Sequence, residues 1–428
     1  MSASNDRRDF LKAAATAAFT TNIFTGNLKG ANDKINAAFI GMGRMGRGNL
    51  GHAMKQDNLV VTQVCDVFKP NLDLAVEQTQ GKAKGVRDFR EILADKSVDV
   101  VCISTPDHWH AYQTVEACKA GKDVYVEKPV CVAIDEGKKM VEAARKYNRV
   151  VQAGTMQRSG KHFQEATDIV KSGKLGKVSM VHTWNYSLME PEGIGSPADA
   201  APPDTLDWDM WLGPAPKRPF NANRFGVDPK AFSHFRWFWD YAGGMMTDWG
   251  VHWLDIVQMA FDEAMPTVAT AVGGKFRLTD NRETPDTIHA SYEYNGFCCT
   301  YENRYGNGQS MFGKNGGILF YGDKGTLFVD RSEYRVVPEK GSSLQEVQVK
   351  SSNNSNNSHW QNFLECVRTR QKPISDIEKC YRSTATCLMA NIALRSKTRL
   401  DWDGETIKQS EARKYMFREY RKPWKLSV

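Results

Sequence analysis

The 428-residue sequence has no Cys-x-x-Cys motif, no cluster of basic residues and no apolar stretch long enough to span a membrane. Its nine cysteines are an odd number without metal-ligand spacing, which argues against a complete disulfide framework and favours buried, reduced thiols. The net charge of +7 is spread along the chain, so no nucleic-acid partner is indicated. The composition is that of an ordinary globular protein, and the length predicts two domains.

The stretch at residues 34–46, KINAAFIGMGRMG, combines an apolar run with a glycine-rich turn. Residues 35–40 have the pattern of a buried parallel strand, and residues 47–55 can continue as a helix. A phosphate bound at this turn would lie at a helix N-terminus, where free N–H groups and the helix dipole favour anions. The stretch therefore predicts the first strand, turn and helix of a dinucleotide-binding fold.

Each glycine of the turn has a distinct expected role. Gly41 permits the tight turn, Gly43 lets a pyrophosphate approach the backbone, and Gly46 lets the helix pack against the strand. Arg44 and Met45, between the last two glycines, are expected to contact the cofactor. Because glycine turns are common, a turn in some other α/β domain is the alternative interpretation.

An acidic residue in the right place strengthens the cofactor prediction. A second strand is expected at residues 59–65, and Asp66 follows it, twenty residues after Gly46. A carboxylate there can accept hydrogen bonds from both ribose hydroxyls and repels a 2′-phosphate. The sequence thus predicts NAD as the cofactor, with NADP disfavoured.

Residues 6–12, DRRDFLK, resemble a twin-arginine export signal, and a modest apolar run follows at residues 13–24. Residues 1–33 are therefore expected to be a signal and linker outside the folded domains, and the protein is expected to be exported to the periplasm. A disordered N-terminus with a chance Arg-Arg pair is the alternative. Since this route carries folded proteins to a compartment without a supply of NAD, an exported NAD enzyme is expected to hold its cofactor tightly.

Residues 34–155 alternate between strands and helices, which predicts a doubly wound parallel sheet. Ligands of such sheets bind beyond the carboxyl ends of the strands. This rule singles out the glycine turn, the loop 105–110 and the tripeptide 127–129. Lys128 precedes a proline, which holds it extended and aims its side chain, whereas His108 and His110 could simply pack. Further strands are expected at 98–104, 123–126 and 150–153, and helices at 71–80, 88–94, 111–120 and 135–147.

Residues 156–428 predict an α+β domain with a large, mostly antiparallel open sheet and C-terminal helices that return to the first domain. A helix from about Met245 is expected to carry Asp248 and His252 on one face, four residues apart. The carboxylate can orient the imidazole and raise its pKa for proton abstraction. A surface pair or half of a metal site are alternatives, but no third ligand has suitable spacing, so no metal is expected. Strands are expected at 177–185, 267–277, 289–294, 298–304, 317–321, 326–329 and 334–337, a hairpin turn at 322–325, and helices at 163–172, 359–369 and 376–395.

Four residues of this second domain are predicted to contact substrate. Arg158 follows the last strand of the first domain, and Tyr186 follows the strand predicted at 177–185. Arg236 and Trp237 precede the segment that carries Asp248. Seven of the eleven tryptophans lie between residues 184 and 253, and sugars bind against aromatic faces, although most of these rings are expected to pack the domain.

Taken together, these motifs resemble the Gfo/Idh/MocA oxidoreductases, and the similarity covers nearly the whole chain after residue 33. The motifs are GMGRMG at 41–46, Asp66, Thr105-Pro106 with His110, Glu127-Lys128-Pro129, and GGMMTDWGVH at 243–252. The resemblance implies that Lys128 touches both substrate and nicotinamide, that His252 and Asp248 supply the acid/base pair, and that the open sheet forms a homodimer or homotetramer. It also implies cofactor contacts from Gly41, Gly43, Arg44, Met45, Gly46, Asp66, Thr105, Pro106, His110, Glu127 and Lys128.

The sequence therefore predicts an exported, NAD-dependent oxidoreductase acting on a sugar, sugar derivative or glycoside. One alternative is a redox-neutral glycosidase or lyase that forms a transient 3-keto sugar. That branch of the family departs from Glu-Lys-Pro, so the tripeptide at 127–129 favours the oxidoreductases. A second alternative is a non-catalytic, NAD-bound scaffold, against which Lys128, Asp248 and His252 argue together.

Overall fold

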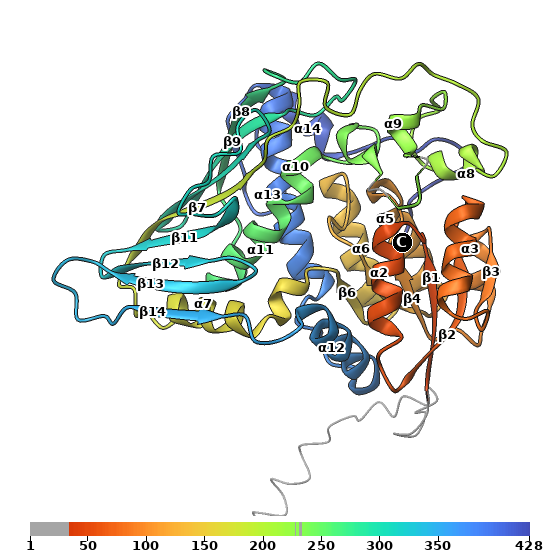
Figure 1. Ribbon diagram of the computed structural model, residues 1–428, viewed down its shortest axis with the longest axis horizontal. Helices are drawn as coiled ribbons and strands as arrows, with labels where there is room; N and C mark the ends of the chain where they lie inside the picture. Colours follow the sequence, from red (N-terminus) through yellow and green to blue (C-terminus); the bar gives the residue numbers. More distant parts are fainter. Residues whose placement is uncertain (1–33, 227, 231–232) are drawn as a thin grey trace, which may run out of the picture. The chain divides into compact units, whose positions relative to one another are not determined.

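The computed structural model describes residues 34–226, 228–230 and 233–428 (Figure 1). The predicted export signal at residues 1–33 lies outside the described residues and stays a prediction. Nothing in the described part of the chain forms a helix of the length and apolar character needed to cross a membrane.

The first sheet has six parallel strands in the order β3-β2-β1-β4-β5-β6, which confirms the predicted doubly wound sheet. The sequence did not predict β3, because Lys84–Val86 is short and only Val86 is buried in it. The strands are β1 (Ile35–Ile40), β2 (Leu59–Cys65), β3 (Lys84–Val86), β4 (Val100–Ile103), β5 (Asp123–Val126) and β6 (Val151–Ala153).

One helix of this domain starts earlier than predicted. Pro106, with φ −57°, is the N-cap of α5 (Asp107–Lys119), and Asp107 is an acidic residue in its first turn. Both features favour a helix start, so most of the expected loop at 105–110 is helical. The other helices are α2 (Arg44–Ala53), α3 (Lys69–Gln78), α4 (Phe89–Ala94) and α6 (Ile134–Lys146).

The second sheet has nine strands in the order β14-β13-β12-β11-β7-β10-β9-β8-β15. Only β7 and β10 pair in parallel, so the predicted mostly antiparallel sheet is confirmed. Gly322 pairs with Gly325 across the predicted hairpin turn. The strands are β7 (Val178–Tyr186), β8 (Val268–Gly274), β9 (Thr287–Tyr294), β10 (Phe297–Arg304), β11 (Gly316–Gly322), β12 (Gly325–Val329), β13 (Glu333–Pro338), β14 (Val347–Lys350) and β15 (Leu400–Asp401).

Helices cover one face of this sheet and lie between it and the parallel sheet (Figure 1). These are α7 (Lys161–Lys171), α11 (Gly250–Ala260) and α13 (Ile377–Ser396). A short turn, η1 (Met156–Ser159), links β6 to α7. The connection from β7 to α11 is long and irregular, and it contains α8 (Trp208–Leu212), α9 (Ala222–Phe225), η2 (His234–Trp237) and α10 (Gly244–Asp248).

The helix predicted to carry both Asp248 and His252 is interrupted. α10 ends at Asp248, and α11 begins at Gly250. The His252 N–H bonds to the Trp249 carbonyl instead of the Asp248 carbonyl. The Asp248 carbonyl accepts a hydrogen bond from Lys128 Nζ at 3.2 Å. A residue 120 positions away thus takes the place of the helical bond.

The C-terminal helices return to the first domain, as predicted. Trp360 of α12 (Ser355–Thr369) is 1% exposed and packs in a core with Phe39 of β1. Its ring stacks on Tyr125 of β5 at 4.6 Å between centroids and 4° between planes. The chain then continues after α13 and β15 through α14 (Ser410–Arg413) and η3 (Lys414–Met416).

Trp360→Ala is expected to destabilise the fold by about 3–5 kcal/mol, because it removes a fully buried ring and leaves a cavity. The measurement is the thermal midpoint of the cofactor-free protein. Phe276→Ala, at a side chain 74% exposed, is the control and should shift the midpoint little. Equal effects of the two substitutions would contradict the packing role of Trp360.

All nine cysteines are free, and only Cys298 is exposed. The other eight are buried, as predicted.

Candidate active site

The glycine turn after β1 forms a tight cradle. A Cβ added at Gly41, which has φ +85°, would lie 2.6 Å from the Thr105 nitrogen. A Cβ at Gly46 would lie 1.9 Å from the Gly41 carbonyl oxygen. At Gly43, the N-cap of α2, a Cβ would meet no atom within 4 Å. The turn is therefore close-packed behind and open in front of the helix N-terminus, as a bound pyrophosphate requires.

Asp66, at the end of β2, is hydrogen-bonded to this turn. Its carboxylate accepts hydrogen bonds from the backbone N–H groups of Met42 at 2.7 Å and Phe68 at 2.8 Å. Burial raises the pKa of Asp66 to about 6, although these two bonds act in the opposite direction. Asp66 also lines the cavity in front of the turn, where the sequence places the ribose hydroxyls.

One cavity runs from the glycine turn to Lys128, at the carboxyl ends of the parallel strands. Phe225 and Phe235 of the irregular connection contribute to its wall. Gly46 is not part of the lining, because it packs behind the turn. The predicted site residues that do line the cavity are Gly41, Gly43, Arg44, Met45, Asp66, Thr105, Pro106, His110, Glu127, Lys128, Arg236 and Asp248.

Three charged residues that line the cavity form a group that we call the Lys128 cluster: Lys128, Asp248 and Arg236. Lys128 Nζ lies 2.6 Å from Asp248 Oδ1, and Arg236 Nη1 lies 2.7 Å from Asp248 Oδ2. Burial alone would raise the pKa of Asp248, but Arg236 and Lys128 outweigh it and hold that pKa well below the usual range. Asp248 is thus firmly ionised, and it positions Lys128.

His252 lies beside this cluster but does not line the cavity. Burial holds its pKa well below the usual range, and the positive charges of Arg331 and Lys128 act in the same direction. Its Nδ1 is buried and has no hydrogen-bond partner among the described residues. The predicted orienting bond from Asp248 is absent from the described contacts, since both Asp248 oxygens are engaged by Lys128 and Arg236. His252 is consequently a neutral imidazole at neutral pH.

Glu127 and His110 are structural supports of the cavity. Glu127 accepts a hydrogen bond from Asn49 Nδ2 at 2.8 Å. The His110 ring nitrogens lie 2.7 Å from the Pro129 carbonyl and 2.8 Å from the Thr105 carbonyl, and burial lowers the pKa of His110 to about 4. His110 therefore ties the two loops together. His108 packs in the interior, one of the two possibilities that the sequence allowed, and its Nε2 lies 3.0 Å from the Trp211 carbonyl.

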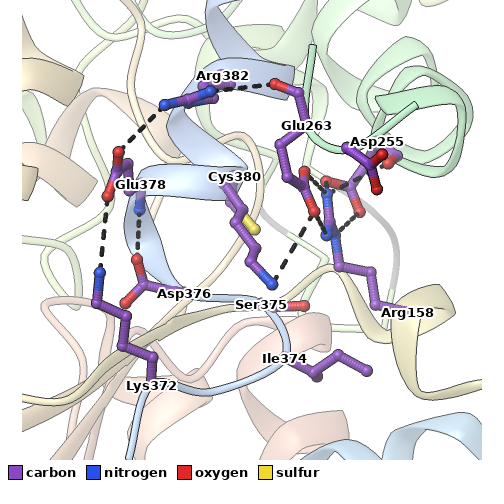
Figure 2. Close-up of polar contacts among 12 residues, drawn as sticks. Arg158, Asp255, Glu263, Lys372, Ile374, Ser375, Asp376, Glu378, Cys380 and Arg382 are labelled. Carbon is purple, nitrogen blue, oxygen red and sulfur yellow. Dashed lines mark hydrogen bonds and ion pairs between the residues drawn. The ribbon is translucent and has the colours of Figure 1, made fainter. Parts of the chain in front are cut away.

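Three predicted substrate contacts are corrected by the structure. Arg158 is 1% exposed and pairs with Asp255 and Glu263, as Figure 2 shows. Because those ion pairs occupy its guanidinium, Arg158 braces α11 and cannot reach a ligand. The residue before it, Gln157, is buried and donates to the His252 carbonyl at 3.1 Å.

The other two corrected residues are aromatic and packed. Tyr186 donates its hydroxyl to Glu302 at 2.7 Å, and the Arg304 guanidinium lies 3.6 Å from its ring centroid. Trp237 is covered by the Arg282 guanidinium at 4.3 Å from its ring centroid. Neither ring lines the cavity, so only Arg236 of the four predicted substrate residues does.

Two family models match consecutive parts of the chain. One, described as "Oxidoreductase family, NAD-binding Rossmann fold", matches residues 35–155. The other, described as "Oxidoreductase family, C-terminal alpha/beta domain", matches residues 160–426, more than half of the chain. The chain belongs to the Gfo/Idh/MocA oxidoreductase family. Its first domain is the NAD-binding Rossmann domain of that family, which confirms the predicted cofactor.

Individual relatives in this family are distant. An inositol 2-dehydrogenase of Salmonella paratyphi B is 32% identical over 155 residues, which cover 36% of this chain and 46% of that protein. A glycosyl hydrolase family 109 protein of Shewanella pealeana is 26% identical over 171 residues, covering 37% of this chain and 38% of that protein. The chain thus spans less than half the length of these curated relatives. The crystal structure of the WlbA dehydrogenase from Bordetella pertussis in complex with NADH and UDP-GlcNAcA has a TM-score of 0.65 and 19% identity, and the match covers 86% of this chain and 99% of that chain.

Asp107 is a cavity residue that the sequence analysis missed. It lies in the first turn of α5, 8% exposed, within electrostatic range of Lys128, Asp248 and Arg236. Burial raises its pKa to about 8; Lys128 opposes this shift and Asp248 adds to it. The Pro106-Asp107 pair, a typical helix start, was the available signal.

Asp107→Asn is expected to make the cofactor-free protein more stable at pH 8, by about 5 kcal/mol, with the gain vanishing near pH 4. Between the ordinary carboxyl pKa and about 8, the folded wild type holds a proton that the unfolded chain has released. Its stability therefore falls as pH rises through this window, and the asparagine variant lacks that loss. Thermal midpoints measured from pH 4 to 9 test this, and parallel curves for the two proteins would contradict it.

Proposed function

We propose that the protein is an NAD-dependent oxidoreductase that acts on a hydroxyl or keto group of a sugar, sugar derivative or glycoside. The observation that carries the proposal is the Lys128 cluster, which lines the same cavity as the phosphate-binding turn. NAD, when bound, supplies the hydride acceptor for such a reaction. Lys128 and His252 supply the positioning of the substrate and the proton transfer.

Lys128 is suited to hold the reacting substrate oxygen. Of its three N–H donors, two bond to Asp248 Oδ1 and to the Asp248 carbonyl. Within the described part of the chain, the third is left for a substrate hydroxyl or keto oxygen. Because the ammonium is fixed before substrate binds, it stabilises negative charge on that oxygen without reorganisation.

His252 is suited to move the hydroxyl proton. Its lowered pKa keeps the ring neutral, so one ring nitrogen offers a lone pair. The ionised Asp248 nearby favours the protonated ring that results. Asp248 thus positions Lys128 through hydrogen bonds, and its negative charge stabilises the protonated form of His252.

Purified protein incubated with NAD⁺ and a panel of sugars and glycosides tests this proposal. The expected result is absorbance of reduced nicotinamide at 340 nm and a keto product for at least one compound. NAD-bound protein that transforms none of them would favour the non-catalytic scaffold instead.

A redox-neutral glycosidase is the second candidate, because a glycosyl hydrolase family 109 protein is among the relatives. Product analysis separates the two: this candidate releases free aglycone without net oxidation. The Glu-Lys-Pro tripeptide at 127–129 favours the oxidoreductase.

Three further expectations belong to the proposal. Export by the twin-arginine route is checked by N-terminal sequencing of periplasmic protein. A tightly held cofactor would appear as stoichiometric nucleotide, identified by mass spectrometry after denaturation. Assembly into a homodimer or homotetramer would cover the open sheet face, where Met180, Tyr321 and Val272 are exposed, and light scattering measures it.

A further inference from the structure

A turn between β12 and β13 carries Arg331, which lies within electrostatic range of Asp248 and His252 and, like His252, is not among the residues that line the cavity. Asp330 Oδ1 accepts hydrogen bonds from the Ser332 backbone at 2.8 Å, the Ser332 hydroxyl at 2.7 Å and the Glu333 backbone at 2.9 Å. The Asp330 carbonyl lies 2.9 Å from His162 Nε2. These bonds fix the backbone on both sides of Arg331.

The Arg331 guanidinium is held by contacts that lead to His252. It lies 4.5 Å from the ring centroid of Trp249. Its Nε donates to Gln157 Oε1 at 3.0 Å, and Gln157 Nε2 donates to the His252 carbonyl at 3.1 Å. Arg331 is thereby linked to Trp249 by a ring contact and to His252 by two hydrogen bonds through Gln157.

Within the described residues, both Nη groups of Arg331 remain available. Solvent reaches the side chain, and within the described residues no carboxylate lies at ion-pair distance from it. Since Nε is occupied by Gln157, the free edge is the Nη1–Nη2 pair. That edge matches the two oxygens of a carboxylate.

The charge around the site also favours an anion. Lys128, Arg236 and Arg331 are cationic, and Asp248 is the firmly ionised counter-charge. Asp107, with its pKa raised to about 8, is mostly protonated at neutral pH. The positive charges therefore outnumber the negative ones before substrate binds.

We propose that Arg331 is a substrate-binding residue that pairs its Nη1–Nη2 edge with the carboxylate of an acidic sugar, a uronic acid or a uronide. This inference rests on the proposed function and narrows its substrate class. The carboxylate docks on Arg331 while a ring hydroxyl reaches Lys128.

Matched acid and neutral pairs test the inference: methyl glucuronide against methyl glucoside, and the corresponding galacturonide against galactoside. For the NAD-loaded wild type, kcat/KM should be higher for the acid of a pair. Arg331→Gln should lower kcat/KM for the acid about 100-fold and for the neutral sugar less than about threefold, because charged hydrogen bonds are lost only with the acid. Arg331→Lys keeps the positive charge but loses the paired N–H donors of the guanidinium. It should lower kcat/KM for the acid about tenfold.

Arg277→Gln, at an exposed arginine outside the site, is the control and should leave both members of each pair unchanged. Thermal midpoints show whether the Arg331 variants are folded. Preference for the neutral sugars, or an equal loss on both members in Arg331→Gln, would overturn the inference and leave the proposed function standing. If the NAD-bound wild type oxidises neither member of any pair, the acidic-sugar assignment is contradicted. If it oxidises no compound in the wider panel of sugars and glycosides, the proposed function itself is contradicted.

Discussion

Replacing Lys128 by alanine is expected to lower kcat by roughly 10²–10⁴-fold while NAD affinity changes less than about fivefold. Lys128 Nζ is the pre-positioned donor at the substrate end of the cavity, held 2.6 Å from Asp248 Oδ1. The glycine turn, a separate part of the cavity lining, is expected to carry most of the cofactor affinity. Steady-state kinetics and fluorescence titration with NAD measure the two quantities separately.

Lys96→Ala is the matched control, because Lys96 is an exposed lysine of the same domain outside the cavity. It should leave both quantities unchanged. An unchanged kcat in Lys128→Ala would remove Lys128 from the reaction. Loss of NAD binding together with activity would instead make it a cofactor-binding residue.

Gly43→Ala is expected to weaken NAD binding at least about 100-fold, or roughly 2.7 kcal/mol, without destabilising the cofactor-free protein. Gly43 has φ −60°, which alanine adopts freely, and its added Cβ would meet nothing within 4 Å. The methyl group therefore costs the empty fold nothing. It occupies the space where the pyrophosphate must approach the backbone of α2.

Gly48→Ala, within the same helix, is the control. Its Cβ would also meet nothing within 4 Å, and alanine in a helix interior stabilises by up to about 1 kcal/mol. NAD affinity should be unchanged there. Gly46→Ala is a poorer test, because its Cβ would collide with the Gly41 carbonyl oxygen and disturb the turn itself. Normal NAD affinity in Gly43→Ala would contradict the placement of the pyrophosphate.

The parts of the site that local patterns encode could be predicted from the sequence. Gly41 and Gly43 follow a buried strand, Asp66 follows the next one, and Lys128 precedes a proline at a strand end. Strand ends of a parallel sheet meet at one edge, so these residues had to converge. The structure places Gly41, Gly43, Asp66 and Lys128 around one cavity.

Side-chain direction and distant contacts could not be predicted. The segment after β6 was expected to aim Arg158 at the cleft, yet its guanidinium pairs with Asp255 and Glu263, which lie far from it in the sequence. The break between α10 and α11 depends on Lys128 Nζ, a partner 120 residues away. Arg331 comes within electrostatic range of Asp248 through the order of β12 and β13 in the second sheet, which no local pattern encodes.

The same limit explains the errors on Tyr186 and Trp237. Aromatic composition indicates that rings will pack or bind sugars, but it does not say which rings face the cleft. Tyr186 hydrogen-bonds to Glu302 of the neighbouring strand β10, and Trp237 lies beneath Arg282. Their partners come from distant strands and loops of the second domain.

Isotope transfer tests the central claim, that this cavity moves a hydride between a sugar carbon and NAD, most directly. NAD-loaded protein is mixed with perdeuterated sugars and denatured, and the released nucleotide is weighed by mass spectrometry. We predict reduced nucleotide that carries a single deuterium, which wild type forms and Lys128→Ala does not. Reduced nucleotide without deuterium, or bound NAD that none of the sugars reduces, would contradict the account.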